Sequence, residues 1–225
     1  MIEQSTLTFL TELQENNNRD WFNDHRKKYE IARDNFAAFV EQLILDLSKM
    51  DEFITEATPK NAIFRIFKDV RFSKDKSPYK THFSASIAKG GRKSMYPGYY
   101  IHLEPNNKSL LASGIWRPQP EILKSVRQEI AYNHKAYEKI ISHSAFTRAF
   151  GTVEGNRLVR PPKGFDKDHP AIEHLKMKDF VVHHKVQDIE ICKSEFNNYC
   201  VETFKIAQPF SAYFRGPVYD VLESE

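Results

Sequence analysis

The spacing of the apolar residues changes twice along this chain of 225 residues, and the change limits the folds it can adopt. From about residue 5 to 49, and again from about 120 to 207, apolar residues recur every three or four positions, as in helices with one buried face. Between residues 82 and 116 they alternate with polar residues, which indicates half-buried strands. This order predicts an α+β fold with N-terminal helices, a central antiparallel β-meander and C-terminal helices, rather than a doubly wound sheet. We see no linker or repeat, so we expect a single domain over residues 1–225.

The helical parts have recognisable ends. A short helix is predicted from Ser5, and a longer one from about residue 20 to 49. After the strands, helices are expected at residues 120–130, 132–141, 144–150 and 189–207, the last one capped by Asp188. Pro209 is expected to start a final helical piece, because proline fits a first helical turn. Residues 151–169 are rich in Gly, Pro and charge, which predicts a long surface excursion.

The alternating segments predict strands at residues 82–88, 98–104 and 109–116. Asn106 and Asn107 suit a tight hairpin turn, because asparagine tolerates positive φ. Residues 64–66 can add a strand, and residues 180–182 are a short strand candidate. The alternation places Tyr100, His102 and Glu104 on one face of their strand, and His82, Ser84 and Ser86 on one face of theirs. If the two strands pair suitably, both polar sets line the same cleft.

Positive charge is concentrated in one part of the chain. Residues 60–93 hold ten Lys or Arg and two Asp, a net charge of +8, whereas the other residues carry −5 and the whole chain +3. Aromatic residues are interleaved with these charges. This asymmetry indicates where a function is located, but it does not identify a reaction.

At the same segment the sequence resembles a known family. The resemblance rests on FRI at residues 64–66 with Asp69, RFSKDKSPYK at 71–80, YYIHL at 99–103 and SGIWRP at 113–118. The early NRDWF at 18–22 is similar as well. These motifs resemble a family described only as a conserved hypothetical protein or domain of unknown function. The resemblance implies a single-domain protein of about this size, and it implies no reaction, substrate or catalytic residue.

The basic segment has the groups that an anion-binding loop needs, namely several cationic donors on a short piece of backbone. The candidate ligand-binding residues are Arg65, Arg71, Ser73, Lys74, Lys76 and Lys80. The candidate structural or orienting residues are Asp69, Asp75, Pro78 and Trp116. The alternative is a salt-bridge network in which the acidic residues use up the positive charges within the fold, and exposed pairs of that kind stabilise little.

The titratable residues beside this segment are candidates for proton transfer. They are Tyr79, His82, Tyr100 and His102. The sequence has no GxSxG, P-loop, GxGxxG, CxxC or HExxH motif. Whether the protein is an enzyme is therefore left open, and no cofactor is assigned.

Nine histidines raise the question of a metal site. His82, His102 and Glu104 can meet across strands as a set of two histidines and one carboxylate. The alternative, which we prefer from the sequence, is hydrogen-bonded histidines in a cleft, so no metal is predicted. His183 and His184 are adjacent in a strand pattern and are expected on opposite faces.

Three functions are compatible with the sequence. The preferred one is binding of a small anionic, phosphate-bearing ligand between the basic loop and the sheet, with or without catalysis. The second is nucleic-acid binding by the basic and aromatic residues. The third is a protein–protein interaction module. The oligomeric state is not indicated.

The sequence also bears on location. It shows no apolar run of the length of a membrane helix and no signal peptide, so we expect no membrane association. Cys192 and Cys200 are predicted on one helix about 12 Å apart, too far for a disulfide. Two unpaired thiols favour a cytoplasmic protein.

Overall fold

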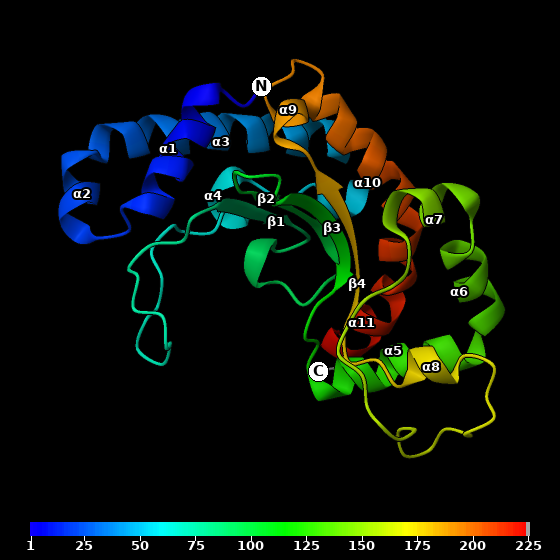
Figure 1. Ribbon diagram of the computed structural model, residues 1–225. Coiled ribbons are helices and arrows are strands. Elements are labelled where there is room, and N and C mark those ends of the chain that lie inside the picture. The colour runs from blue at the N-terminus through cyan, green and yellow to red at the C-terminus, as the bar shows by residue number, and fades with distance from the viewer. Residues whose placement is uncertain (224–225) are drawn as a thin grey trace.

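A four-stranded antiparallel sheet lies at the centre of the molecule (Figure 1). The computed structural model describes residues 1–223. The strands β1 (Phe83–Ile87), β2 (Gly98–Leu103), β3 (Ser109–Ile115) and β4 (Phe180–Val186) are neighbours in chain order. This confirms the predicted α+β fold with an antiparallel meander.

Helices precede and follow the strands, as predicted. The N-terminal part contains α1 (Gln4–Glu15), α2 (Arg19–Asp24), α3 (Arg26–Ser48), η1 (Glu52–Ile54) and α4 (Pro59–Ala62), and η2 (Gly91–Lys93) lies between β1 and β2. Between β3 and β4 lie α5 (Pro120–Tyr132), α6 (His134–Ile141), α7 (Ser144–Phe150) and α8 (Ile172–Leu175). After β4 follow α9 (Asp188–Ile191), α10 (Phe196–Tyr213) and α11 (Arg215–Leu222).

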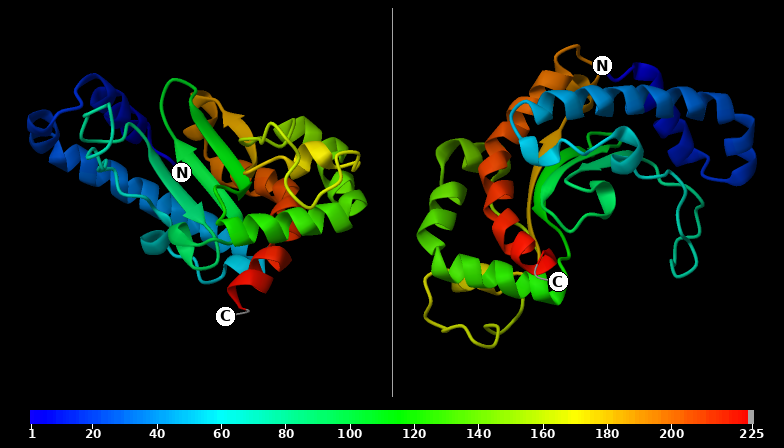
Figure 2. Two further views of the ribbon diagram at one scale, coloured as in Figure 1. Left: turned by 90° about the horizontal axis from the view of Figure 1, so that it is seen from below. Right: turned by 180° about the vertical axis from the view of Figure 1, so that it is seen from behind.

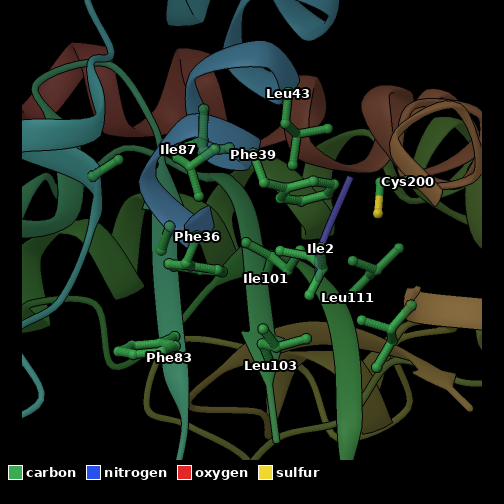
Figure 3. Close-up of a cluster of buried hydrophobic side chains, with 14 of the residues drawn as sticks. Ile2, Phe36, Phe39, Leu43, Phe83, Ile87, Ile101, Leu103, Leu111 and Cys200 are labelled. Atoms are coloured by element: carbon green, nitrogen blue, oxygen red, sulfur yellow. The ribbon is translucent and has the colours of Figure 1, made fainter. Parts of the chain in front are cut away.

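One face of the sheet is buried against α3 and α10. Phe36, Phe39 and Leu43 of α3 pack toward Ile101 and Leu111 of the strands (Figure 3). A second group of buried side chains joins the C-terminal half of α10 to β4 and to α5, α6 and α7. In the left view of Figure 2, the strands are seen from the side opposite α3 and α10. The sheet therefore has one covered face and one open face, and the open face carries the site described below.

Two predicted helices have different ends in the structure. The helix predicted from residue 20 to 49 is divided at His25, whose ring stacks on Trp21 with 4.2 Å between ring centroids. The helix predicted from 189 to 207 is also divided, because α9 ends at Ile191 and α10 begins at Phe196. Cys192 therefore lies outside α10, and both it and Cys200 are free.

Pro209 lies inside α10 and does not start a new helix, contrary to the prediction. A proline in a helix interior costs about 3 kcal/mol, because it removes one hydrogen bond and crowds the preceding turn. Phe204, Ala207 and Phe210 flank it and are fully buried. Their burial against the sheet and against α6 and α7 offsets that cost and keeps the chain helical to Tyr213.

The strands also differ from the prediction in two places. The short candidate at 180–182 is the beginning of β4, which pairs with β3 over seven residues. Residues 64–66 form no strand, and this segment has only the isolated bridges Ile63–Ala85 and Phe67–Tyr79 on either side. The predicted turn at Asn106 and Asn107 is confirmed, with φ values of 67° and 57°.

None of the helices in residues 1–223 combines the length and the apolar character that a bilayer crossing requires.

Candidate functional site

The open face of the sheet gathers the polar side chains of β1 and β2. Ser84 is paired with His102 and Ser86 with Tyr100, so the polar sets of both strands point the same way. The alternate residues of both strands, such as Ala85 and Ile101, point to the opposite face and are buried under α3. The predicted common face is therefore present.

The next strands extend this face. Ala112 of β3 is the partner of Tyr100, and His183 of β4 is the partner of Ala112. His183 lies 3.3 Å from Glu154, whereas the ring of His184 contacts Ala149 O and the Tyr199 hydroxyl. The two histidines are thus on opposite faces, as predicted.

A pocket of about 510 Å³ lies over the open face. Phe64 and Lys80 come from the segment before β1, Arg92 and Tyr96 from the connection between β1 and β2, and Trp116 from the end of β3. His82 directly precedes β1, and the strands contribute, among others, Ser84, Ser86, Tyr100, Ser113 and His183.

Two paired glycines also line the pocket, and the backbone of a neighbouring strand approaches each of them closely. Gly98 of β2 pairs with Gly114 of β3. A Cβ atom at Gly114 would lie 2.0 Å from Phe180 O, and its φ of 124° disfavours any other residue. A Cβ atom at Gly98 would lie 2.4 Å from Ile87 O. Both positions therefore require glycine.

Tyr100 and His102 of β2 and Glu104, the residue after this strand, form a chain of polar contacts along the open face. The Tyr100 hydroxyl is 3.1 Å from Nδ1 of His102, and Nε2 of His102 is 2.8 Å from Oε2 of Glu104. The other carboxylate oxygen accepts a hydrogen bond from Gln14, 3.4 Å away. A neutral His102 that donates from Nε2 to the carboxylate accepts at Nδ1 from the Tyr100 hydroxyl. The chain therefore fixes the orientation of the Tyr100 oxygen at the pocket wall.

His82 lies beside this chain. Its ring centroid is 4.0 Å from that of His102, and its Nδ1 is 4.0 Å from Oε2 of Glu104. Burial, with the nearby charges of His102 and Lys80, lowers the pKa of His82 to about 3. His82, His102 and Glu104 each offer one ligand atom, and these atoms all lie within 4.8 Å of one another. The structure thus brings together the two histidines and the carboxylate that could hold a metal ion. It also shows His102 hydrogen-bonded to Glu104, as the alternative of hydrogen-bonded histidines expects.

Lys80 is the one predicted anion-binding residue that lines the pocket. Its ammonium group lies 5.3 Å from the centre of the Phe64 ring. Burial lowers the pKa of Lys80, and the charge of Arg65 lowers it further. Among residues 1–223, no ion pair joins Lys80 to a carboxylate. A half-buried cation therefore borders the pocket without an acidic partner.

The other basic candidates lie away from the pocket. Residues 67–79, here called the basic hairpin, extend from the body of the protein as a loop (Figures 1 and 2). The bridge between Phe67 and Tyr79 closes the loop, with a hydrogen bond from Lys68 N to Pro78 O. Arg65 precedes it and is exposed. The hairpin residues Arg71, Ser73, Lys74 and Lys76 do not line the pocket.

The acidic residues of the basic hairpin form ion pairs with basic side chains of the same loop. Asp69 accepts two hydrogen bonds from the Arg71 guanidinium, at 2.9 and 2.7 Å, and these lower the pKa of Asp69 to about 2. Asp75 accepts from Lys68 at 2.5 Å and from Ser77 N at 2.8 Å, which lowers the pKa of Asp75. Arg71 and Lys68 are therefore each paired with a carboxylate of the same loop.

Tyr79 anchors the basic hairpin and does not face the pocket. Its ring is buried and stacks on Phe22 at a centroid distance of 3.9 Å. Its backbone N–H donates to the side chain of Asn17, and its carbonyl accepts from the same side chain. Among the candidates for proton transfer, only His82 and Tyr100 line the pocket. His102 does not line it and contacts the Tyr100 hydroxyl.

Trp116 forms an edge of the pocket, with 68% of its surface exposed. The Arg117 guanidinium lies 4.6 Å from the centre of the Trp116 ring. The backbone of Arg117 has a φ of 48° and donates to the buried Asp179 at 2.7 Å. Asn156 also donates to Asp179, so this carboxylate fixes the end of β3.

Sequence reasoning missed Arg92, Tyr96, His183 and the glycine pair. The alternation of side chains along β4 could have assigned His183 to the open face. The predicted strand ended at residue 182, however, so His183 lay outside it. Arg92 and Tyr96 lie in the connection between β1 and β2, which has no periodic pattern. The local sequence therefore did not indicate that their side chains line the pocket.

Comparison with known proteins gives a family and no close relative. Neither a search of curated proteins nor a search of solved structures finds a match. A family model for conserved hypothetical proteins matches residues 5–213, which is most of the chain. The chain therefore belongs to the conserved hypothetical protein family DUF2461, as its resemblance suggested.

Proposed function

We propose that this protein binds a small organic anion, with a phosphate or carboxylate group, in the pocket on the open face of the sheet. The observation that carries the proposal is Lys80, a half-buried ammonium at the pocket without an acidic partner in residues 1–223. Buried charges in proteins are normally paired, because an unpaired one loses its hydration without compensation. An anionic ligand supplies the missing partner.

The size and lining of the pocket suit a small molecule. Ligand pockets usually measure about 300–1,000 Å³ and combine apolar walls with a few polar groups. Here the aromatic walls include Tyr96 and Trp116, and Ser84 and Ser86 supply hydroxyl groups. The oriented oxygen of Tyr100 is a further polar contact for a ligand. Arg92 adds positive charge, although one of its nitrogens already donates to Lys60 O.

The proposal is tested with a panel of inorganic phosphate, sugar phosphates, mononucleotides and dicarboxylates. Thermal shift identifies the compounds that bind, and isothermal titration calorimetry gives their affinity. In Lys80→Met the affinity falls by at least about tenfold, as expected for losing a charge-assisted hydrogen bond of about 1.5–3 kcal/mol.

Lys76→Met is the matched control, because it removes the same charge from the exposed basic hairpin. It leaves the affinity within about twofold. Equal affinities of wild type and Lys80→Met for every compound that binds, or binding by none of the panel, contradict the proposal.

A second candidate function rests on the basic hairpin. Phe72 at its tip is 95% exposed, and Arg71 and Lys74 flank it in the sequence. An exposed aromatic ring beside cationic groups is suited to stacking on a base and to contact with phosphates. Nucleic-acid binding at this loop predicts a steep loss of affinity with salt and a loss with Phe72→Ala. If no oligonucleotide binds at low ionic strength, this candidate is rejected.

Location in the cytoplasm is also part of the proposal. Cys192 and Cys200 are free thiols, which agrees with a reducing compartment. Fractionation of cells that express the tagged full chain tests this, and recovery in an extracytoplasmic fraction contradicts it.

A further inference from the structure

We infer that His82, His102 and Glu104 bind a divalent transition-metal ion beside the pocket. Their ligand atoms converge from the segment before β1 and from the end of β2. Nε2 of His102 and Nδ1 of His82 lie 2.8 and 4.0 Å from the same oxygen, Oε2 of Glu104. The three side chains are between 15 and 24% exposed, so the cluster is largely removed from solvent and still reachable.

These distances are close to those around a bound ion. With metal–ligand bonds of about 2.0–2.1 Å, neighbouring ligand atoms are about 3.0–3.4 Å apart. The ligand atoms of the cluster lie within 4.8 Å of one another, so the widest pair must close by up to about 1.4 Å to reach this geometry, which side-chain rotation can supply.

The donor set selects the class of ion. Imidazole nitrogens are suitable ligands for zinc, iron, nickel and copper ions, whereas Mg²⁺ and Ca²⁺ prefer oxygen ligands. Two histidines with one carboxylate occur in zinc hydrolases and in non-haem iron enzymes, where open positions remain for water or substrate. His82 lines the pocket, so an ion held here borders the space proposed for the organic anion.

Two outer contacts orient the ligands. The Tyr100 hydroxyl contacts the other ring nitrogen of His102, and Gln14 donates to the other oxygen of Glu104. Metal ligands in proteins normally have such partners, which fix the ring tautomer and the carboxylate. Two cations lie near and weaken the binding: Lys108 is 4.0 Å from Glu104, and the charge of Lys80 reaches His82.

Metal binding also predicts a change in the proton position of His102. In a neutral ring without metal, the tautomer that donates from Nε2 to Glu104 accepts at Nδ1 from the Tyr100 hydroxyl. When the ion occupies Nε2, the proton moves to Nδ1 and is donated to the Tyr100 oxygen. Between a neutral ring and a metal-bound ring, the change is one of tautomer alone.

The experiment is a calorimetric titration of the chelator-treated full chain with Zn²⁺, Co²⁺, Mn²⁺ and Mg²⁺, without any organic ligand. We expect one equivalent of Zn²⁺ or Co²⁺ per chain, with a Co²⁺ absorption band and a change in the ¹⁵N chemical shifts of His102. Each of His82→Gln, His102→Gln and Glu104→Gln weakens the affinity by about 100-fold or more. His183→Gln is the control, because His183 lies on the same face and has a carboxylate partner of its own.

Thermal unfolding of each metal-free variant shows whether the variant is folded. The site is supported if Zn²⁺ raises the unfolding temperature of the wild type but not that of folded Glu104→Gln. The inference is overturned if no transition metal binds, if only Mg²⁺ binds, or if His183→Gln weakens the binding as much as the three ligand variants. Because these titrations contain no organic anion, and the anion panel is run on metal-free protein, the two proposals fail separately.

Discussion

At the scale of single residues, Lys80 and Arg71 show two uses of positive charge within the same basic segment. Arg71 is paired with Asp69, both side chains are exposed, and such a pair contributes little to stability. Lys80 is half-buried and has no carboxylate partner in the described chain. Charge density along the sequence could not separate these cases, because burial and partners depend on the path of the chain.

A titration of Asp69 tests the description of the hairpin. Its pKa is expected near 2, below the ordinary value of about 3.9, because the Arg71 guanidinium donates to its ionised form. The contribution of this pair to stability is therefore present above about pH 4 and is lost as the pH falls through about 2. The carboxyl ¹³C shift measured by NMR gives the value, and Arg71→Ala returns it toward 3.9. A midpoint near 3.9 in the wild type contradicts the contact.

At the scale of elements, the open face of the sheet was predictable and the position of the basic hairpin was not. The shared face of Tyr100, His102 and Ser84 follows from the alternation of side chains along paired strands, which is a local rule. The hairpin is instead held by Asn17 and Phe22, which contact Tyr79 from the N-terminal helices about sixty residues earlier. No local pattern contains that information, so the sequence could not show that the candidate anion-binding residue Arg71 lies away from the pocket.

The β3–β4 pairing depends on Gly114. Gly114→Ala places a Cβ atom against Phe180 O in a backbone conformation that alanine avoids. We expect a destabilisation of more than about 3 kcal/mol in urea unfolding, as for severe overpacking combined with backbone strain.

Gly216→Ala is the matched control for this change. Gly216 lies in α11, and a Cβ atom there meets no atom within 4 Å apart from its chain neighbours and the helix backbone. The free energy of unfolding is expected to change by less than about 1 kcal/mol, because the gain in helix propensity is offset by the contact of the new Cβ atom with the ring of Pro217. Equal stability of the two variants contradicts the assigned packing of Gly114.

At the scale of the whole molecule, a buried polar cluster connects the segment after α3 and the C-terminal helix α11 to the sheet. Asp51 follows α3, accepts a hydrogen bond from the Tyr99 hydroxyl of β2 at 2.6 Å, and forms an ion pair with Arg215 of α11. Because α10 also packs against both groups of buried side chains, we propose that the chain unfolds as one unit. Urea unfolding followed by circular dichroism and by the fluorescence of Trp21 and Trp116 is expected to give coincident transitions. Separate transitions contradict a single domain.

Removal of Arg215 is expected to weaken the whole fold. Arg215→Met leaves the carboxylate of Asp51 buried without its cation, at a cost of about 3–5 kcal/mol. Lys205→Met, which removes an exposed partner of Glu202, changes the free energy of unfolding by less than about 1 kcal/mol. The urea midpoints of the two variants measure the difference, and equal midpoints would show that the buried pair adds nothing.

We propose that the ammonium of Lys80 receives an anionic group in the pocket on the open face. A crystal structure of the full chain with the compound of the anion panel that binds most tightly tests it directly. We expect an anionic oxygen about 2.7–3.2 Å from Nζ of Lys80, with the rest of the bound molecule between Tyr96, Tyr100 and Trp116. A compound bound at the basic hairpin, or in the pocket without contact to Lys80, would contradict it.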